Sequence, residues 1–273
     1  MLTLAGLRKY NRYQAALGHF GLSLIIFAIL GYLVYFCWYP QPLFSIDAGW
    51  QGMRILAFVD FVLGPCITLV IFNPKKKELF KDLAIIALIQ VSALSYGTYH
   101  VYQSRPAIVV YADNGFYTIA LSELEHFPLS KELLDEVSYI SPVYKLLDIP
   151  REKHLIEYAV ETDDFVNYET LQDLRILSIQ KETPFYLLEE YLMDYQANIA
   201  TINKHSYDLS SVKSELPEAD KKLLNKWIES NPNYKNYSYT SLIGRFGKTI
   251  VKVDKKTGVF LGYIPVDYHD GYL

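Results

Sequence analysis

Three long apolar stretches occupy the first part of the chain. Residues 16–38 carry no charged side chain and form a run of 23 residues, roughly 34 Å of helix at about 1.5 Å per residue. Residues 52–72 form a second stretch, with Arg54 at its start and Asp60 inside it, and residues 83–104 form a third without charge. Since the hydrocarbon core of a bilayer is about 30 Å thick, the pattern predicts three transmembrane helices.

Short β-rich runs separated by turn residues characterise both ends of the remaining sequence. Residues 107–112 and 116–120 enclose an Asp-Asn-Gly turn signal, which predicts a β-hairpin. Residues 249–253 and 259–264 flank a polar turn in which Gly258 is free to take a positive φ angle. This second pattern predicts another hairpin.

Helical periodicity lies between the two hairpins. A 3.6-residue rhythm predicts a helix with apolar positions at Leu188, Tyr191, Leu192, Tyr195, Ile199 and Ile202. Pro217 opens a second helical pattern, and residues 231–239, rich in Asn and Tyr, are expected to form a loop. The predicted fold is an α+β membrane protein, with a three-helix membrane domain at residues 1–104 and an extracytoplasmic α+β domain at residues 105–273.

The charge balance differs between these two parts. Residues 1–104 hold eight basic and four acidic side chains, whereas residues 105–273 hold 18 and 26. An apolar, net-positive part joined to an acidic, water-like part argues against a uniform soluble enzyme, a disordered chain or a collagen-like repeat. With a formal net charge of −4, nothing in the electrostatics supports nucleic-acid binding.

Basic residues around the spans predict the orientation. They lie before the first span or between the second and the third, at Arg8, Lys9, Arg12, Lys75, Lys76, Lys77 and Lys81. The positive-inside rule therefore places the N-terminus in the cytoplasm and the C-terminal domain on the opposite side of the membrane of a multi-pass protein. A cleaved signal peptide is the alternative for the first span, but the apolar run exceeds the roughly 7 to 15 residues of such peptides.

The motifs of familiar enzymes are missing from the sequence. It has no phosphate-binding glycine loop, Cys-x-x-Cys pair, His-Glu-x-x-His helix or Gly-x-Ser-x-Gly elbow. Its six histidines include no pair four residues apart, the spacing that holds a metal on one helix face. The acidic doublet Asp163-Asp164 has the chemistry to bind a cation, but a solvated turn is the commoner fate of such a doublet. We expect no enzymatic activity, cofactor or metal.

Asp60 is the most informative single residue. It lies nine residues into the second span, near the midplane, where an ionised carboxylate costs at least ~2.5 kcal/mol. In one interpretation, Gln90, Ser92 or Ser95 of the third helix hydrogen-bonds Asp60 inside the bundle. In the other, Asp60 faces an intramembrane groove and engages a polar group on a transmembrane helix of a partner.

Several features near Asp60 add to this picture. Gly64-Pro65 interrupts the same helix, and the missing N–H of proline predicts a kink near Phe61. Arg54 at the outer end is expected to snorkel to the interface and to pair with Asp47. The three lysines that follow this span are expected to determine topology and to contact lipid phosphate, with a docking role as the less common alternative.

Two features of the second part suggest further contact surfaces. Tyrosines are favoured at binding hot spots, and residues 231–239 carry Tyr234, Tyr237 and Tyr239, although an ordinary surface loop is the commoner case. The exposed strands of the first hairpin can accept a strand from a partner, although internal pairing is the commoner fate of such edges. The candidate partner-binding residues are Asp60, Gly64, Pro65, Arg54, Tyr234 and Tyr237.

The order and spacing of many short motifs resemble one family. They are Trp38-Tyr39-Pro40, Pro42-Leu43, Gly49, Gly52, Asp60, Leu63-Gly64-Pro65, Pro74, Lys76-Lys77, Asp82-Leu83, Gln90, Tyr96-Gly97, Arg105-Pro106, Val253-Asp254, Thr257-Gly258 and Gly262-Tyr263. Together they resemble the TfpX/TfpZ family of type IV pilin accessory proteins, most densely over residues 15–115.

The resemblance implies a non-enzymatic factor of the bacterial inner membrane, with its C-terminal domain in the periplasm. Such a protein associates with a particular type IV major pilin and supports its assembly or tunes extension and retraction of the filament. Membrane lipids and other components of the pilus machinery are further expected partners. One alternative is a membrane sensor with an extracytoplasmic ligand-binding domain. Another is a pilin-modifying enzyme, which is expected to place an acidic or histidine cluster at the outer face, where residues 40–53 hold only Asp47.

Overall fold

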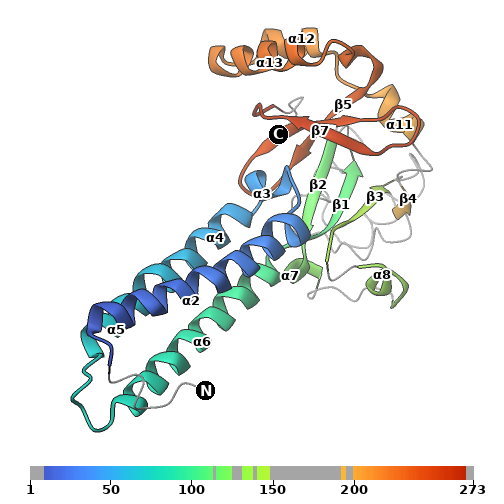
Figure 1. The fold of residues 1–273 in the computed structure, drawn as a ribbon. Coiled ribbons are helices and arrows are strands. Elements are labelled where there is room, and N and C mark those ends of the chain that lie inside the picture. Colours follow the sequence, from blue (N-terminus) through green and yellow to red (C-terminus); the bar gives the residue numbers. More distant parts are fainter. Residues whose placement is uncertain are drawn as a thin grey trace, which may run out of the picture. The chain divides into compact units, whose positions relative to one another are not determined.

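The computed structural model describes residues 9–112, 115–124, 131–137, 140–147, 192–194 and 199–268. The chain divides into two compact units. The first comprises Met1–Phe44 and Ala48–Arg105, and the second comprises Ser45–Asp47 and Pro106–Leu273. Long helices make up the first unit, and a mixed sheet with short helices makes up the second (Figure 1).

The first unit contains three continuous helices. Helix α2 (Arg12–Tyr32) continues into the π-helical segment η1 (Leu33–Trp38). The second helix consists of α4 (Gly49–Phe58), the π-helical segment η2 (Val59–Leu63) and α5 (Gly64–Ile71), and the third is α6 (Leu79–Gln103). Among the described residues, these three are long and apolar enough to cross a membrane by length and composition.

Local signals explain where the first and third helices begin or end. Asn11 caps α2, because its side chain accepts from the N–H of Gln14 at 2.8 Å while the Gln14 side chain accepts from the N–H of Asn11 at 3.0 Å. This capping box begins the helix four residues earlier than the apolar run alone predicts. Helix α6 ends at Gln103, just ahead of Pro106, whose ring disfavours helical backbone in the preceding residue.

Close side-chain packing holds the three helices together. Helix α2 contacts α5, and α4 contacts α6. Phe61 of η2 lies between two rings of α2, with centroid distances of 5.5 Å to Phe20 and 4.7 Å to Phe27. The hydroxyl of Tyr39 donates to the carbonyl O of Val101 at 2.9 Å, and both side chains belong to a buried core. The outward faces remain apolar, which suits contact with hydrocarbon.

A seven-stranded sheet forms the second unit, in the order β4-β3-β1-β2-β5-β6-β7. Strand β1 (Pro106–Ala112) pairs antiparallel with β2 (Gly115–Ala120) and parallel with β3 (Val143–Leu147), which in turn pairs with β4 (Leu192–Asp194). The predicted first hairpin is therefore confirmed. Both of its edges are paired within the chain, since β2 also pairs parallel with β5.

The second predicted hairpin is also confirmed. Strands β5 (Ser238–Ile243), β6 (Lys248–Val253) and β7 (Phe260–Ile264) form an antiparallel meander. Gly258, in the turn between β6 and β7, has a φ of 72°, the left-handed conformation that a glycine adopts without a steric penalty.

The sheet is strongly curled. The rings of Tyr144 in β3 and Phe260 in β7 have centroids 5.0 Å apart, and Phe260 also lies 4.9 Å from Phe116 in β2. In a flat sheet with strands about 4.8 Å apart, β3 and β7 would be separated by roughly 24 Å. The contact therefore requires the last strand to bend back over the face of the earlier ones.

Helices α12 (Leu209–Glu215) and α13 (Glu218–Ser230) cover the last three strands. Leu209, Val212 and Leu224 pack with Ile250 and Ile264 in a second core. The helix predicted from Pro217 onward is confirmed. Its charged side points away from this core, as its strong amphipathic pattern requires.

The middle of the chain differs from the sequence prediction. Leu192–Asp194 is a strand, and a helix, α11 (Ile199–Lys204), begins only afterwards, so a continuous helix over residues 188–202 is wrong. The predicted loop over residues 231–239 is also partly wrong, since it contains the 3₁₀ turn η5 (Tyr234–Asn236) and the start of β5. Pairing with distant strands overrides the local pattern here. Asp163-Asp164 lies outside the described residues.

Short helices complete the two units. These are α3 (Leu43–Ile46), α7 (Leu121–Leu124) and α8 (Lys131–Glu136). Ser45–Asp47, which belongs to the second unit, lies on the turn between β5 and β6. There the N–H of Phe246 donates to the carbonyl O of Ile46 at 2.9 Å, and a Cβ at Gly244 would lie 2.5 Å from that oxygen. Only glycine fits at this close approach.

Candidate functional site

A buried polar contact joins the second and third helices of the first unit. Asp60 in η2 is 1% exposed. The Nε2 of Gln90 in α6 donates to Asp60 Oδ1 at 3.0 Å and to the carbonyl O of Val59 at 3.2 Å. Gln90 is one of the three partners predicted from depth along the helix. Asp60 thus lies inside the bundle, as in the first of the two interpretations.

Pro65 explains why Asp60 stands in a widened turn. Proline has no N–H to donate to the carbonyl of Phe61, so the regular helical bond is missing at this point. The N–H of Gly64 bonds instead to the carbonyl O of Val59, five residues back, which produces the π-helical segment η2. The irregularity predicted near Phe61 therefore takes the form of a π turn.

His19 brings the first helix into the same cluster. Its Nδ1 lies 2.6 Å from Thr68 Oγ1 in α5, a hydrogen bond whose direction depends on the imidazole tautomer. A Cβ built on Gly64 would lie 2.9 Å from His19 Nε2 and 2.8 Å from Gln90 Oε1. The missing side chain of Gly64 therefore leaves the space that these two side chains fill. We call His19, Asp60, Gly64, Thr68 and Gln90 the polar cluster.

The polar cluster is suited to holding helices together. It takes polar side chains from all three continuous helices, two of them from the second. Hydrogen bonds between helices in an apolar environment each contribute about 0.6 kcal/mol, with a maximum near 1.7. Within the described residues, Asp60 Oδ2 is buried and has no hydrogen-bond partner. The same part of the chain contains no group of three or more His, Cys, Asp or Glu side chains that could hold a metal ion.

A shallow groove lies elsewhere on the first unit, between α2 with η1 and α6. Its volume is about 500 Å³, and its lining is mostly apolar: Ile26, Leu30, Trp38, Leu94, Ser95, Thr98, Tyr99 and Tyr102. Ser95, a second predicted partner of Asp60, belongs to this lining. The groove and the polar cluster are therefore built from different residues.

Arg54 and Asp47 do not form the predicted pair. The guanidinium of the exposed Arg54 lies 5.7 Å from the ring centroid of Trp50. Asp47 is fully buried, and its Oδ1 accepts from Arg245 Nε at 2.5 Å. The prediction is wrong because Arg245, 198 residues away in sequence, approaches Asp47 through the β5–β6 turn.

The tyrosines near η5 are only partly accessible. Tyr234 and Tyr237 are half-buried and pack against the core beneath α12 and α13. The ammonium of Lys252 lies 4.0 Å from the Tyr237 ring centroid, a cation–π contact. Tyr239 is buried, and its hydroxyl donates to the carbonyl O of Tyr234 at 2.7 Å. Burial raises the pKa of the Tyr239 phenol, so this hydroxyl remains a donor.

Two members of the polar cluster were not predicted. His19 is one of six histidines without a metal-binding spacing, and Thr68 carries no local signal in the sequence. A polar side chain at an intermediate depth of an otherwise uncharged span is itself a signal. His19 meets this criterion, whereas the hydroxyl of a threonine can be satisfied within its own helix and gives no such indication.

Comparisons with known proteins bear on the identity of the chain. A fimbrial assembly protein of serogroups C1 and C2 from Dichelobacter nodosus is 39% identical over 95 residues, which cover 34% of this chain and 72% of that protein. The chain belongs to the family of fimbrial assembly proteins.

Further comparisons agree with this assignment. The fimbrial assembly proteins of serogroups I and E1 from the same organism are 33% and 31% identical over 129 residues, 46% of this chain and 47% of each relative. The match thus spans about half the length of these two relatives. The family described as fimbrial assembly protein FimB matches residues 7–47, which include α2, η1 and α3. No solved structure gives a significant match.

The family assignment agrees with the resemblance seen in the motifs at the level of fimbrial assembly. The narrower TfpX/TfpZ assignment stays a prediction. The segment that matches the FimB family includes His19, so one member of the polar cluster lies in the family-matched segment.

Proposed function

We propose that the protein is a non-enzymatic accessory factor of the bacterial inner membrane that binds a cognate type IV major pilin and supports or modulates pilus assembly. The observation that carries the proposal is the family match over residues 7–47, the segment that forms the first apolar helix. A pilin waiting for assembly is held in the membrane by its own apolar helix. A helix-on-helix contact in the bilayer is therefore the simplest mode of binding.

The outward face beside the polar cluster is the proposed contact surface. Val62 and Leu63 are 44% and 39% exposed, although Asp60 and Gly64 next to them are buried. We assign Asp60, Gly64 and Pro65 an indirect role. The π turn and the bond to Gln90 fix the backbone on which Val62 and Leu63 are displayed.

Further contacts are proposed outside the apolar helices. Arg54 carries an exposed positive charge beside Trp50, itself 53% exposed, at the end of the second helix that is proposed to be periplasmic. Tyr234 and Tyr237 offer the accessible parts of their rings on the second unit. These three side chains are proposed to contact the globular part of the pilin, where aromatic and arginine side chains commonly provide affinity.

Photocrosslinking in living cells tests the pilin contact. A photoreactive amino acid is placed at Val62 or Leu63, and as a matched control at Leu88 of α6, which is 68% exposed. The expected adduct at the first two positions contains the apolar N-terminal segment of the pilin, with a lower yield at Leu88. Recovery of unrelated proteins only, together with normal pilus number after deletion of the gene, would reject the proposal.

Protease digestion of intact spheroplasts tests the orientation separately. The proposal places the second unit in the periplasm, so the protease should remove residues after Pro106 and leave the helices intact. A C-terminal part that survives while a known periplasmic protein is digested contradicts this orientation.

A further inference from the structure

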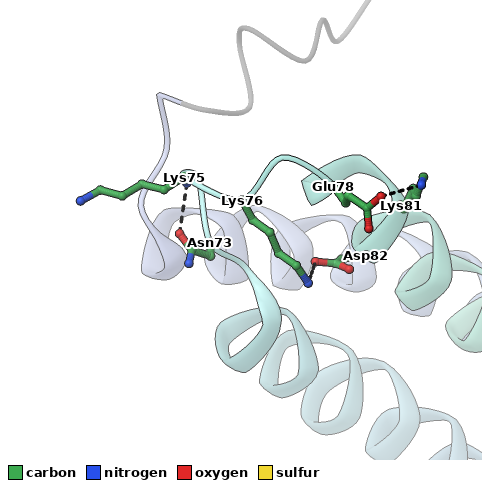
Figure 2. Close-up of polar contacts among 6 residues, drawn as sticks. All are labelled: Asn73, Lys75, Lys76, Glu78, Lys81 and Asp82. Carbon is green, nitrogen blue, oxygen red and sulfur yellow. Dashed lines mark hydrogen bonds and ion pairs between the residues drawn. The ribbon is translucent and has the colours of Figure 1, made fainter.

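Lysines of two kinds lie in the loop between α5 and α6 and in the first turn of α6 (Figure 2). Lys76 Nζ lies 2.5 Å from Asp82 Oδ2, and Lys81 Nζ lies 2.7 Å from Glu78 Oε1. Each of these two ammonium groups is therefore neutralised by a carboxylate of the same loop or of the first turns of α6. Such pairs offer little net charge to a ligand outside the chain.

The other two lysines of the loop have no such partner. Lys75 and Lys77 are exposed, and no carboxylate of the described residues pairs with either. The N–H of Lys75 donates to Asn73 Oδ1 at 3.1 Å, which closes a turn around Pro74. In Figure 2 the side chain of Lys75 extends away from the helix ends, whereas Lys76 turns back toward Asp82.

The flanking residues place these ammonium groups at the level of lipid headgroups if the helices span a bilayer. Ile71 ends α5 with 40% of its surface exposed, and Phe80 in the first turn of α6 is 59% exposed. Both side chains suit the edge of the hydrocarbon. The lysines between them in sequence lie just beyond that edge, where the negative charge of a membrane surface resides in lipid phosphate.

We propose that Lys75 and Lys77 bind the phosphate groups of acidic phospholipids, whereas Lys76 and Lys81 are occupied by Asp82 and Glu78. The inference rests on the proposed membrane location but not on pilin binding. It assigns the lipid contact to two positions of a run of lysines that the sequence alone leaves equivalent. The ligand is an acidic phospholipid headgroup, held by charge and by hydrogen bonds from the ammonium groups.

The test uses the full chain in nanodiscs of phosphatidylcholine with increasing phosphatidylglycerol. Nanodiscs leave both faces accessible, so an altered orientation in the cell cannot imitate a lipid effect. After transfer to detergent, native mass spectrometry counts the phosphatidylglycerol molecules that stay bound. The variants are Lys75→Gln/Lys77→Gln and, with the same net charge, Lys76→Gln/Lys81→Gln. A third variant, Lys76→Gln/Asp82→Asn, keeps the net charge of the wild type.

The wild type is expected to retain phosphatidylglycerol in preference to phosphatidylcholine. Lys75→Gln/Lys77→Gln should lower this affinity by about thirtyfold, or about fivefold per lysine. The Lys76→Gln/Lys81→Gln variant should lose clearly less of its affinity for phosphatidylglycerol. The Lys76→Gln/Asp82→Asn variant, whose net charge is unchanged, should bind this lipid as the wild type does. Millimolar glycerol phosphate should not displace the lipid, which distinguishes a headgroup in a bilayer from a free phosphate.

Three outcomes would overturn the inference. Equal losses of affinity for phosphatidylglycerol in the two lysine double variants would mean that net charge alone attracts the lipid. Wild-type retention in Lys75→Gln/Lys77→Gln would mean that these lysines serve another partner, such as an acidic protein segment. Displacement by glycerol phosphate would mean a site for soluble phosphate. The readout does not involve pili, so its result is independent of the pilin proposal.

Discussion

Arg245 donates from Nε to Asp47 Oδ1 at 2.5 Å, across 198 residues of sequence. Asp47 is fully buried, and 29% of the Arg245 side chain remains exposed. The pair fixes Ser45–Asp47 on the β5–β6 turn, next to the backbone bond from Phe246 to Ile46. Removal of one charge from a buried pair takes away the opposite charge that offsets the desolvation of the other, which is the costly case.

Arg245→Gln is therefore expected to destabilise the second unit by about 2–4 kcal/mol. Thermal unfolding of the full chain in detergent, followed by near-UV circular dichroism, measures the effect. Lys256→Gln serves as the control, because Lys256 is an exposed lysine of the same unit. Equal melting temperatures for the two variants would contradict the structural role of the pair.

Gly64→Ala is expected to disturb the polar cluster. The new methyl group would lie within 3 Å of Gln90 and His19, so both side chains must move; overpacking of this kind costs about 1–3 kcal/mol. Gly21→Ala is the matched control on α2, since a Cβ there meets nothing within 4 Å. Unfolding in mixed micelles should separate the two variants. Similar stabilities of the Gly64→Ala and Gly21→Ala variants would show that Gln90 and His19 do not pack tightly against Gly64.

The bond between Asp60 and Gln90 is expected to give a measurable coupling energy. Asp60→Asn retains an oxygen that accepts from Gln90, so its effect on stability should be small. Gln90→Leu removes the donor and leaves Asp60 buried without it. A double-mutant cycle of Asp60→Ala and Gln90→Leu should give a coupling free energy of about 0.6–1.7 kcal/mol, the range for hydrogen bonds between helices in membranes. If the effects of the two substitutions on the free energy of unfolding were simply additive, a direct hydrogen bond between Asp60 and Gln90 would be ruled out.

The turn before β7 is expected to make a pH-dependent contribution to stability. The N–H groups of Thr257 and Lys256 donate to Asp254 Oδ1 at 2.8 and 2.9 Å and hold the pKa of this carboxyl below its usual value. The folded state therefore favours the ionised form. The resulting stabilisation is present above the ordinary aspartate pKa and is lost as the pH falls through the lowered value.

Asp254→Ala should accordingly lower the melting temperature at neutral pH, and the difference from the wild type should shrink in acid. Melting curves at about pH 7 and at about pH 3 provide the comparison. Glu229→Ala, at an exposed position of α13, is the control. A difference that is the same at both pH values would show that the ionised carboxyl has no special role in the turn.

The sequence predicts the features that local pattern determines. Uncharged length locates the three helices of the first unit, and turn residues such as Gly258 locate the two hairpins. Strand β3 and its parallel pairing with β1 were not predicted, because contact between distant segments leaves no periodic signal. The same reason applies to the short strand at Leu192–Asp194, where a helical rhythm is misleading.

The candidate site was predictable to a similar extent. The depth of Asp60 and Gln90 along their helices was enough to pair them, since a buried carboxylate requires a partner at its own level. The pairing of Asp47 with Arg245 was not predictable, because Arg54 is nearer in sequence and no local feature links the β5–β6 turn to residues 45–47. Thr68 was not predictable either, because the hydroxyl of a helical threonine does not require a partner from another helix.

The π turn at Val59–Leu63 determines which side of the second helix meets the third. Gly52 approaches Val101, and Gly64 approaches Gln90, so both glycines face α6. In an unbroken α-helix, two positions twelve residues apart point about 120° away from each other. One extra residue in a wide turn reduces this offset to about 20°. Conversion of the wide turn to regular α-helix without loss of a residue would therefore rotate one half of the helix relative to the other, and only one glycine would still meet its neighbour.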